Sequence, residues 1–130
     1  MDGLKALALL VGRIFIAGIF IWDATDMVRF WDGTVAYMES YGLPGALLPL
    51  AALFQFAGGV LIVIGLLTRP TALAFAGYCV VTALIFHNNL GDSGEVIQFG
   101  KDFAIAGGFL FLTAAGAGDW SLDARIGERA

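Results

Sequence analysis

Several polar side chains that could do chemistry stand near the ends of long apolar stretches in this 130-residue chain. They offer carboxylates, amides, an imidazole and an amine. Together these groups could transfer protons, hydrogen-bond a carbonyl or a quinol, or contact an anion. Ionisable groups inside a membrane are costly, and for that reason they indicate function by default. The polar set, a pocket that could bind a ligand, comprises Asp23, Asp26, Gln55, His87, Asn88, Gln98, Lys101 and Asp102.

The same side chains also have a purely structural interpretation. Lys101 with Asp102 or Asp26, and His87 with Gln55, could tie helices together. Polar contacts of this kind are common between helices in membranes. The residue types alone leave the ligand pocket and the structural tie equally open.

Other chemistries are excluded by what the chain lacks. Its single histidine rules out a bis-histidine haem within the chain. No HExxH zinc motif, nucleophile elbow, phosphate-binding loop or dinucleotide fingerprint is present. Its single cysteine, Cys79, cannot form an internal disulfide. We therefore expect no metal and no intrinsic cofactor. The catalytic residues are unknown, and whether the chain is an enzyme stays open.

The composition is that of a membrane protein. Hydrophobic residues make up 59% of the chain and charged residues 14%, with a mean hydropathy of +0.85. Soluble domains carry about 25% charged residues. The formal charge of −4 argues against nucleic acid as a partner, because nucleic acid selects basic surfaces. The lipid bilayer is the first expected partner.

The elements that must position the polar set are four apolar spans. The stretch from Leu47 to Leu67 is 21 residues long without a charge. A helix of that length crosses a bilayer core of about 30 Å. Gln55 is its one strongly polar side chain, so we expect it to face the bundle interior. The predicted fold is an all-α membrane protein, a four-transmembrane-helix antiparallel bundle. It forms a single domain over 1–130, with spans at about 4–30, 47–67, 71–89 and 96–117 and a polar cytoplasmic tail at 119–130.

The connections between the spans carry further expectations. Asp32–Gly33 predicts a turn, followed by a short helix over Val35–Ser40. Thr68–Pro70 predicts a tight link that makes the second and third spans antiparallel neighbours. Trp120 is expected to anchor the tail at the membrane interface. Arg13, within the first span, either snorkels to the interface or pairs inside the bundle.

The basic residues predict the orientation. One side of the membrane holds five of them and the other side only Arg29 and Lys101. The side richer in lysine and arginine is normally cytoplasmic. Both termini are therefore expected in the cytoplasm. The five are Lys5, Arg13, Arg69, Arg125 and Arg129.

Glycines in the spans predict close contact between helices, because they let neighbouring backbones approach. The expected packing positions are Gly58, Gly59, Gly65, Gly107 and Gly108.

The polar groups at the third connection are expected to cluster. His87 ends the third span, and Lys101 and Asp102 begin the fourth. An unpaired ammonium at that depth would be costly, so Lys101 is expected beside a carboxylate. Asp102, Asp23 and Asp26 are the acids at similar depth. We predict that the three residues lie close together beneath the outer surface, with Asp23 or Asp26 nearby.

Nearly the whole chain resembles the DoxX family of small four-helix bacterial inner-membrane proteins. The matching stretches are GRIF from Gly12, YM from Tyr37, YGLP from Tyr41, FAGG from Phe56, GLLTR from Gly65, LIFHN from Leu84, KDFAIAGG from Lys101 and SLD from Ser121. The chain departs from the family where Gln55 replaces a frequent glutamate and Asp102 a frequent asparagine. A further departure falls at Asp23–Met27, where many relatives carry serine-glycine and then lysine.

The resemblance implies a multi-pass protein of the bacterial inner membrane and three competing functions. The first is a non-catalytic accessory or assembly subunit of a respiratory or redox complex. It would pack against another membrane protein or form a homo-oligomer. The second is a redox component that binds a quinone or a lipid in a polar pocket near the periplasmic surface. The third, ranked last, is a small-solute carrier, because no broken helix or inverted repeat is visible.

Overall fold

The structure is a computed structural model, and it describes residues 3–86 and 91–127. The elements in this part of the chain are all helical. Four of them are long and apolar enough to cross a membrane: α1, η1 with α3, α4 and α5. The predicted all-α, four-span membrane fold is therefore confirmed. In order, the elements are α1 (Gly3–Arg29), α2 (Trp31–Ser40), η1 (Gly45–Leu47), α3 (Leu48–Ile64), α4 (Thr68–Phe86), α5 (Ser93–Ala115) and α6 (Leu122–Arg125).

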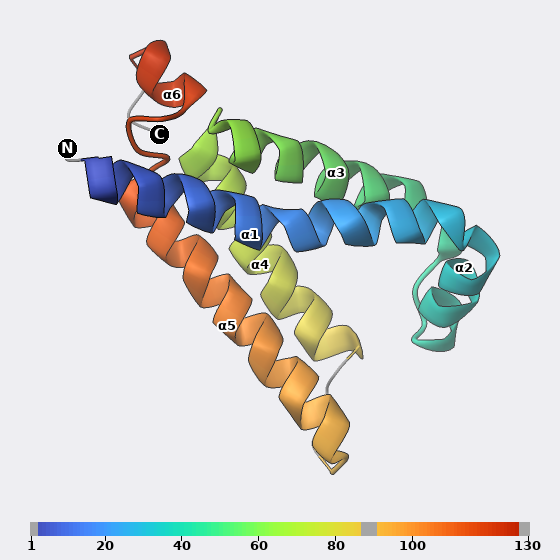
Figure 1. The fold of residues 1–130 in the computed structure, drawn as a ribbon. Helices are drawn as coiled ribbons and strands as arrows, with labels where there is room; N and C mark the ends of the chain where they lie inside the picture. The colour runs from blue at the N-terminus through green and yellow to red at the C-terminus, as the bar shows by residue number, and fades with distance from the viewer. Residues whose placement is uncertain (1–2, 87–90, 128–130) are drawn as a thin grey trace.

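The long helices form two antiparallel pairs (Figure 1). The helices α1 and α3 pack along each other, as do α4 and α5, and contacts between the two pairs are fewer. The pairs cross at an angle. They come together near α6 and diverge toward the end where α2 lies (Figure 1). This divergence creates room for a site between the pairs.

Aromatic rings fill the region where the two pairs meet. Phe75 of α4 is fully buried. Its ring centroid lies 4.8 Å from those of Phe20 and Phe54 and 4.9 Å from that of Phe109. Each of these rings comes from a different long helix. Aromatic pairs at such distances stabilise a core beyond simple burial of area.

Helix α2 starts earlier than the sequence predicted. Asp32–Gly33 is not a turn, because the backbone bends two residues before it, at Phe30, with φ −110° and ψ 51°. Thr34 then closes the first helical turn. Its amide and its hydroxyl both donate to the carbonyl oxygen of Phe30, each at 2.9 Å. As a result α2 turns away from the axis of α1 and lies at the open end of the two pairs (Figure 1).

The link between α3 and α4 also differs from the prediction. Thr68, Arg69 and Pro70 form the first turn of α4, and the chain reverses over residues 65–67. Gly65 ends α3 in the left-handed conformation with φ 75°, which glycine adopts without strain. Its amide donates to the carbonyl oxygen of Leu61 at 2.8 Å. Glycine is therefore the residue that stops α3.

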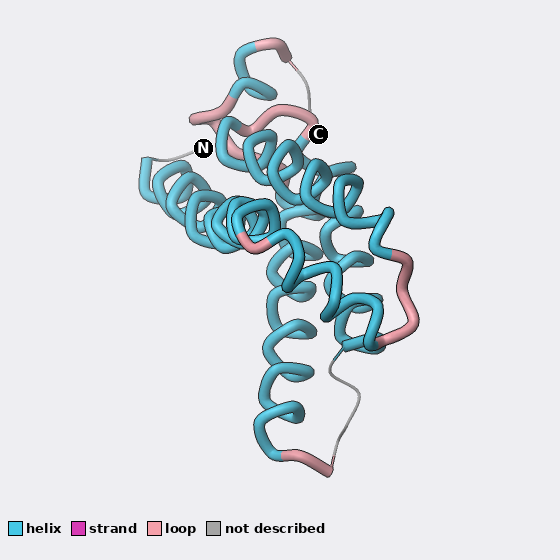
Figure 2. The backbone as a smooth tube through the Cα atoms, turned by 90° about the vertical axis from the view of Figure 1, so that its right-hand side faces the viewer, coloured by secondary structure: helices cyan, strands magenta, loops and turns pink. Residues whose placement is uncertain are grey.

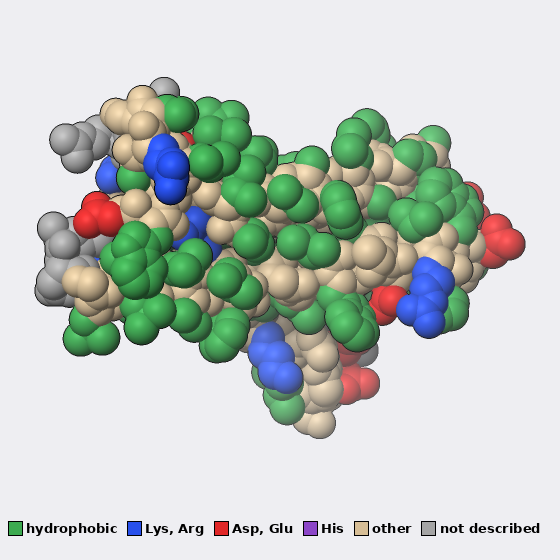
Figure 3. Space-filling view, turned by 45° about the horizontal axis from the view of Figure 1, so that its top comes forward, with side chains coloured by type: hydrophobic (Ala, Val, Ile, Leu, Met, Phe, Trp, Pro, Cys, Tyr) green, Lys and Arg blue, Asp and Glu red, His purple; other side chains and the backbone are tan. Residues whose placement is uncertain are grey.

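The outer surface of the helices is apolar, as lipid contact requires. Phe15 is 75% exposed and Phe111 80% exposed. Figure 3 shows hydrophobic side chains spread over the visible face of the long helices, with charged side chains gathered mainly toward its ends. The start of α5 projects beyond the rest of the molecule (Figures 1 and 2), which leaves its first turns without neighbours from α1 or α3.

Candidate functional site

A polar cavity lies in the open end between the helix pairs. It has a volume of about 490 Å³ and takes lining residues from α1, α2, α3, α4 and α5. Three phenylalanine rings line it, those of Phe20, Phe30 and Phe86. The polar lining residues are Asp23, Asp26, Thr34, Tyr37, Gln55, Tyr78, Thr82 and Asp102.

Gln55 joins three helices at the inner wall of this cavity. It is 3% exposed, which confirms that its amide faces the bundle interior. Its Nε2 donates to the Tyr78 hydroxyl at 2.6 Å, and the Asp23 carboxylate interacts with the same side chain. Its Oε1 has no hydrogen-bond partner among the described residues. An aspartate, an amide and a phenol thus form one polar chain across α1, α3 and α4.

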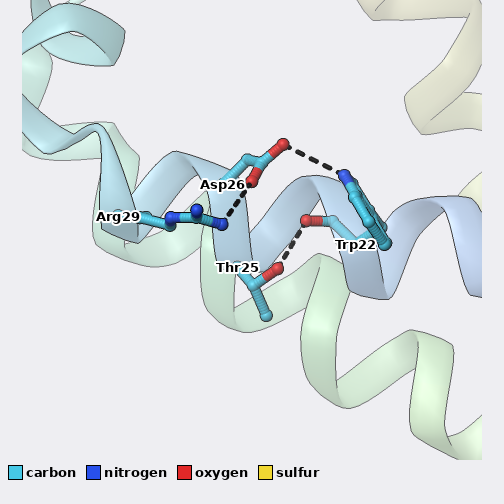
Figure 4. Close-up of polar contacts among 4 residues, drawn as sticks. All are labelled: Trp22, Thr25, Asp26 and Arg29. Atoms are coloured by element: carbon cyan, nitrogen blue, oxygen red, sulfur yellow. Dashed lines mark hydrogen bonds and ion pairs between the residues drawn. The ribbon is translucent and has the colours of Figure 1, made fainter.

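Asp26 stands nearer the end of α1 and is held by its own helix (Figure 4). The indole Nε1 of Trp22 donates to its Oδ2 at 3.1 Å, and Nη1 of Arg29 lies 3.8 Å from its Oδ1. The Arg29 side chain is 72% exposed, so this ion pair contributes little energy. The pair instead fixes the direction of the carboxylate.

Lys101 does not join the site, and the expectation that it would is wrong. Asp102 lines the cavity and is half-buried, whereas Lys101 is exposed on the outside of α5 and is not among the lining residues. Successive residues on a helix point about 100° apart, and on α5 it is Asp102 that faces the cavity. No ion pair joins Lys101 to a carboxylate within the described residues.

The expectation that Gln98 lines the pocket is also wrong. Two further expected pocket residues lie outside the part of the chain that the structure describes. Gln98 shares a face of α5 with Asp102 but is exposed, because it lies one turn nearer the projecting start of that helix. His87 and Asn88 lie outside the described residues. Of the eight predicted pocket residues, the cavity therefore brings together Asp23, Asp26, Gln55 and Asp102.

The outer rim of the cavity is made by rings from α2 and α4. Tyr37 stacks on Phe86 with centroids 5.2 Å apart, and Tyr41 meets the same ring at 5.0 Å. Desolvation raises the pKa of Tyr37 to about 12, and a hydrogen bond with Tyr41 adds to the shift. The Tyr37 phenol is therefore neutral at physiological pH and offers the cavity a hydroxyl rather than a charge.

A second polar cluster occupies the opposite end of the bundle, around Arg13. This side chain is 1% exposed, so it does not snorkel as one of the two predicted alternatives proposed. Its Nη1 donates to the carbonyl oxygens of Ile62 and Val63 at 3.2 and 3.0 Å, and its Nη2 donates to that of Trp120 at 2.6 Å. The guanidinium thus donates to two carbonyl oxygens in the last turn of α3, of which that of Ile62 also accepts the amide of Gly65 at 3.2 Å.

The segment after α5 completes this cluster rather than forming a free polar tail. Asp123 is 2% exposed, and its two oxygens accept the amides of Leu67 at 2.9 Å and Thr68 at 3.0 Å. Its own amide donates to the carbonyl oxygen of Gly65 at 2.8 Å. Asp123 therefore caps the start of α4, where a negative charge is favourable. Part of the predicted polar tail at 119–130 therefore packs against the bundle, and its cytoplasmic location stays a prediction.

The predicted packing glycines divide into two groups. A Cβ atom on Gly58 would come within 2.8 Å of the Phe75 ring, on Gly59 within 2.6 Å of Ile21, and on Gly108 within 2.8 Å of Ile16. On Gly65 it would collide with Arg13 and Ser121. On Gly107 it would meet nothing within 4 Å. Gly107 is therefore not a packing position among the residues that the structure describes, because it lies one residue, or about 100°, away from the face that contacts α1.

The sequence analysis identified neither the hydroxyl groups that line the cavity nor the hydrogen-bond partners of Arg13. Tyr78 and Thr82 sit in an apolar run and carry no signal of their own. For the Arg13 cluster a signal existed. Three of the stretches that carry the DoxX resemblance, at 12–15, 65–69 and 121–123, supply Arg13, Gly65, Thr68 and Asp123, which the fold brings together.

Within the described part of the chain, no three acidic, histidine or cysteine side chains are grouped so that they could hold a metal ion. The three carboxylates of the cavity are therefore spread along its wall rather than focused on one point.

Comparison with known proteins gives a consistent set of relatives. The family model that matches is DoxX, over residues 8–88. The chain is 39% identical over 129 residues to "Inner membrane protein YqjF" of Escherichia coli (strain K12), and the match covers 99% of each chain. It is 38% identical over 128 residues to "Inner membrane protein YphA" of the same organism, covering 93% of this chain and 91% of that protein. No solved structure gives a significant match.

Proposed function

This chain is an integral membrane protein that belongs to the DoxX family, and from that premise we propose that it holds a small amphipathic ligand in its polar cavity on behalf of a partner complex in the inner membrane. In this role it is a non-catalytic accessory subunit. The observation that carries the proposal is the cavity of about 490 Å³ between the two helix pairs.

The lining of the cavity defines what the ligand must offer. Asp23, Asp26 and Asp102 present carboxylate oxygens, and Gln55 Oε1 is a buried acceptor without a partner among the described residues. Buried acceptors left unpaired are costly, so a ligand that donates hydrogen bonds is favoured. The floor is aromatic, since Phe20 belongs to the core cluster around Phe75. A quinol, with two hydroxyl donors on a flat ring, and a protonated amine both meet these requirements.

The accessory role follows from the side chains that the chain provides. A single histidine cannot provide both axial ligands of a bis-histidine haem, and a single cysteine cannot hold an iron–sulfur cluster by itself. Electron transfer to or from a bound quinol would therefore use groups of a partner protein. The exposed apolar surface of α5, on which Phe111 is 80% exposed, is available to lipid or to that partner.

The proposal is tested by blocking the cavity. Gly33 lines it on α2, and a Cβ there would meet nothing within 4 Å, so Gly33→Phe fills the cavity without a clash at the backbone. Gly77→Phe is the matched control, because Gly77 has equal space on α4 but does not line the cavity. Mass spectrometry of the protein, purified in a mild detergent, identifies bound small molecules and subunits.

We expect wild type and Gly77→Phe to retain the same small molecule and Gly33→Phe to lose it. Binding of added decylubiquinol, followed by quenching of tryptophan fluorescence, gives a second readout. Equal retention of small molecules and equal quinol binding by all three proteins would contradict a ligand site in this cavity.

A further inference from the structure

We propose that an apolar groove between α1 and α3 holds one phospholipid molecule, with an acyl chain along the groove and the phosphate beside Arg29. The groove has a volume of about 530 Å³ and shares no lining residue with the polar cavity, which lies on the other side of α1. The proposal is therefore independent of the proposed function. The lining residues are Ala24, Thr25, Val28, Arg29, Trp31, Pro49, Ala52, Leu53 and Phe56.

Two small side chains create the hollow. Ala24 of α1 and Ala52 of α3 are buried, and each places only a methyl group in the floor of the groove. The larger side chains of Val28, Leu53 and Phe56 line the groove beside them and are exposed. An acyl chain in the groove contacts the floor and these side chains together, so it makes more dispersion contacts than it would on a convex helix surface.

The groove has the direction that a phospholipid needs. Arg29 is the last residue of α1, and Pro49 is in the first turn of α3, so both lie where their helices end. Phe56 is seven residues beyond Pro49, which is about 10 Å further along α3. The lining is thus charged at the end of the spans and apolar toward their middle. Trp31 stands at the charged end, and indoles are common at the level of lipid headgroups.

Arg29 is the group that recognises the phosphate. It carries the only charge among the lining residues. Its side chain is 72% exposed, and a guanidinium binds phosphate through two parallel N–H donors. Thr25, the other aliphatic polar residue of the lining, already donates its hydroxyl to the carbonyl oxygen of Trp22 at 2.7 Å. The acceptor that the ligand supplies therefore belongs at Arg29.

The contact between Arg29 and Asp26 leaves room for the phosphate. Nη1 of Arg29 lies 3.8 Å from Oδ1 of Asp26, whereas a charge-assisted hydrogen bond is about 2.7–2.9 Å long. A guanidinium has five N–H donors. Thr25 and Asp26 leave α1 on different sides (Figure 4), and Asp26 lines the polar cavity rather than the groove. Because Asp26 offsets the charge of Arg29, we expect recognition of the phosphate group without a preference for anionic over zwitterionic lipid.

The test compares lipids that differ in their headgroups. Dioleoylphosphatidylcholine and dioleoylglycerol have the same acyl chains, but only the first has a phosphate. Native mass spectrometry of the delipidated full chain, titrated in a mild detergent, measures the dissociation constant of the first lipid bound. We expect phosphatidylcholine to bind about tenfold more tightly than dioleoylglycerol. Anionic dioleoylphosphatidylglycerol should bind about as tightly as phosphatidylcholine.

Two variants with matched controls assign the lipid to the groove. Arg29→Gln is expected to weaken phosphatidylcholine about tenfold, to the level of dioleoylglycerol. Lys101→Gln removes an exposed charge on α5 outside the groove and should change nothing. Thr25→Phe places a ring in the groove from an exposed position and should weaken both lipids, whereas Gly77→Phe places the same ring on an exposed part of α4 and should weaken neither. Circular dichroism checks that each variant keeps its helices.

Several outcomes would overturn the proposal. Equal binding of phosphatidylcholine and dioleoylglycerol, or equal losses in Arg29→Gln and Lys101→Gln, would show that Arg29 does not hold the phosphate. Equal binding by Thr25→Phe and Gly77→Phe would show that the lipid lies elsewhere. A dimer that excludes lipid until it dissociates would show that a second copy of the chain covers the groove. None of these results depends on the polar cavity, which Gly33→Phe tests separately.

Discussion

Arg13 in the first helix donates a 2.6 Å hydrogen bond to the carbonyl oxygen of Trp120, across 107 positions of sequence. This contact joins the beginning of the chain to its end at one corner of the bundle. Asp123 is close enough to interact electrostatically with the same guanidinium. A charged side chain in the first span is thus paired inside the protein rather than with the membrane surface.

Loss of Arg13 is expected to destabilise the whole fold. Arg13→Met leaves the carbonyl oxygens of Ile62, Val63 and Trp120 without their donor, and we expect a loss of about 3 kcal/mol in the free energy of unfolding. Arg29→Met is the control, since the Arg29 side chain is 72% exposed, and it should cost less than about 1 kcal/mol. Unfolding in mixed micelles, followed by circular dichroism, measures both. Equal losses would contradict a structural role for the Arg13 cluster.

The turn at Gly65 gives a prediction that separates backbone strain from steric collision. Gly65 and Gly42 both have positive φ, at 75° and 84°, so alanine at either position costs about 1 kcal/mol in conformation. Only at Gly65 would the new Cβ also strike Arg13 and Ser121. We expect Gly65→Ala to destabilise by at least about 1 kcal/mol more than Gly42→Ala, as overpacking does. Similar thermal midpoints for Gly65→Ala and Gly42→Ala would contradict the prediction, because they would show that Arg13 and Ser121 can move away from the new Cβ atom.

The hydrogen bond between Gln55 and Tyr78 is expected to contribute modestly. Gln55→Leu and Tyr78→Phe should each cost about 1 kcal/mol or less, the usual scale for polar contacts between membrane helices. The double variant should cost less than the sum, with a coupling of about 0.6 kcal/mol. Gln55→Leu combined with Thr113→Val is the additive control, because Thr113 bonds only within α5. Strict additivity in the first pair would contradict the contact.

The orientation in the membrane is predicted from the basic residues and tested by labelling. Cys79 is buried, and Cys79→Ala provides a background without a native thiol. In this background Asp92→Cys places a thiol just before the start of α5. Gly127→Cys places one beyond the other end of α5, after α6. We expect an impermeant thiol reagent added to intact cells to label the first and spare the second. Labelling of both from the same side would contradict the topology.

The sequence was sufficient for the fold because membrane spanning depends on length and apolar composition. It was also sufficient for Gln55, since a lone amide in a long apolar span has few alternatives to an interior position. The carboxylates of the cavity were predictable for the same reason. In each case the energetic cost of exposure to lipid decides the position of one side chain without knowledge of its partner.

The contacts that the sequence did not predict are those in which the position of a side chain depends on its partner in the fold. Lys101 was expected to seek a carboxylate, but its direction is fixed by the rotation of α5, in which Asp102 takes the inward position. Arg13 pairs inside the bundle, as one of the two alternatives predicted, but it donates to backbone carbonyls, and backbone acceptors leave no mark in the residue types. From the sequence alone Asp123 was assigned to a polar tail, because its hydrogen bonds to the amides of Leu67 and Thr68 form only in the folded structure. Such contacts depend on tertiary geometry that local patterns do not contain.

The Arg13 cluster also has a consequence for the order of biosynthesis. The ribosome releases a chain from its first residue onward, so the guanidinium is in place before any of its acceptors exists. The carbonyls of Ile62 and Val63 arrive with the second span, whereas Trp120 and Asp123 are synthesised only after the fourth span. A nascent or truncated chain that stops before them carries an incompletely satisfied cation in its first helix, and the segment that follows the fourth span completes the burial of Arg13.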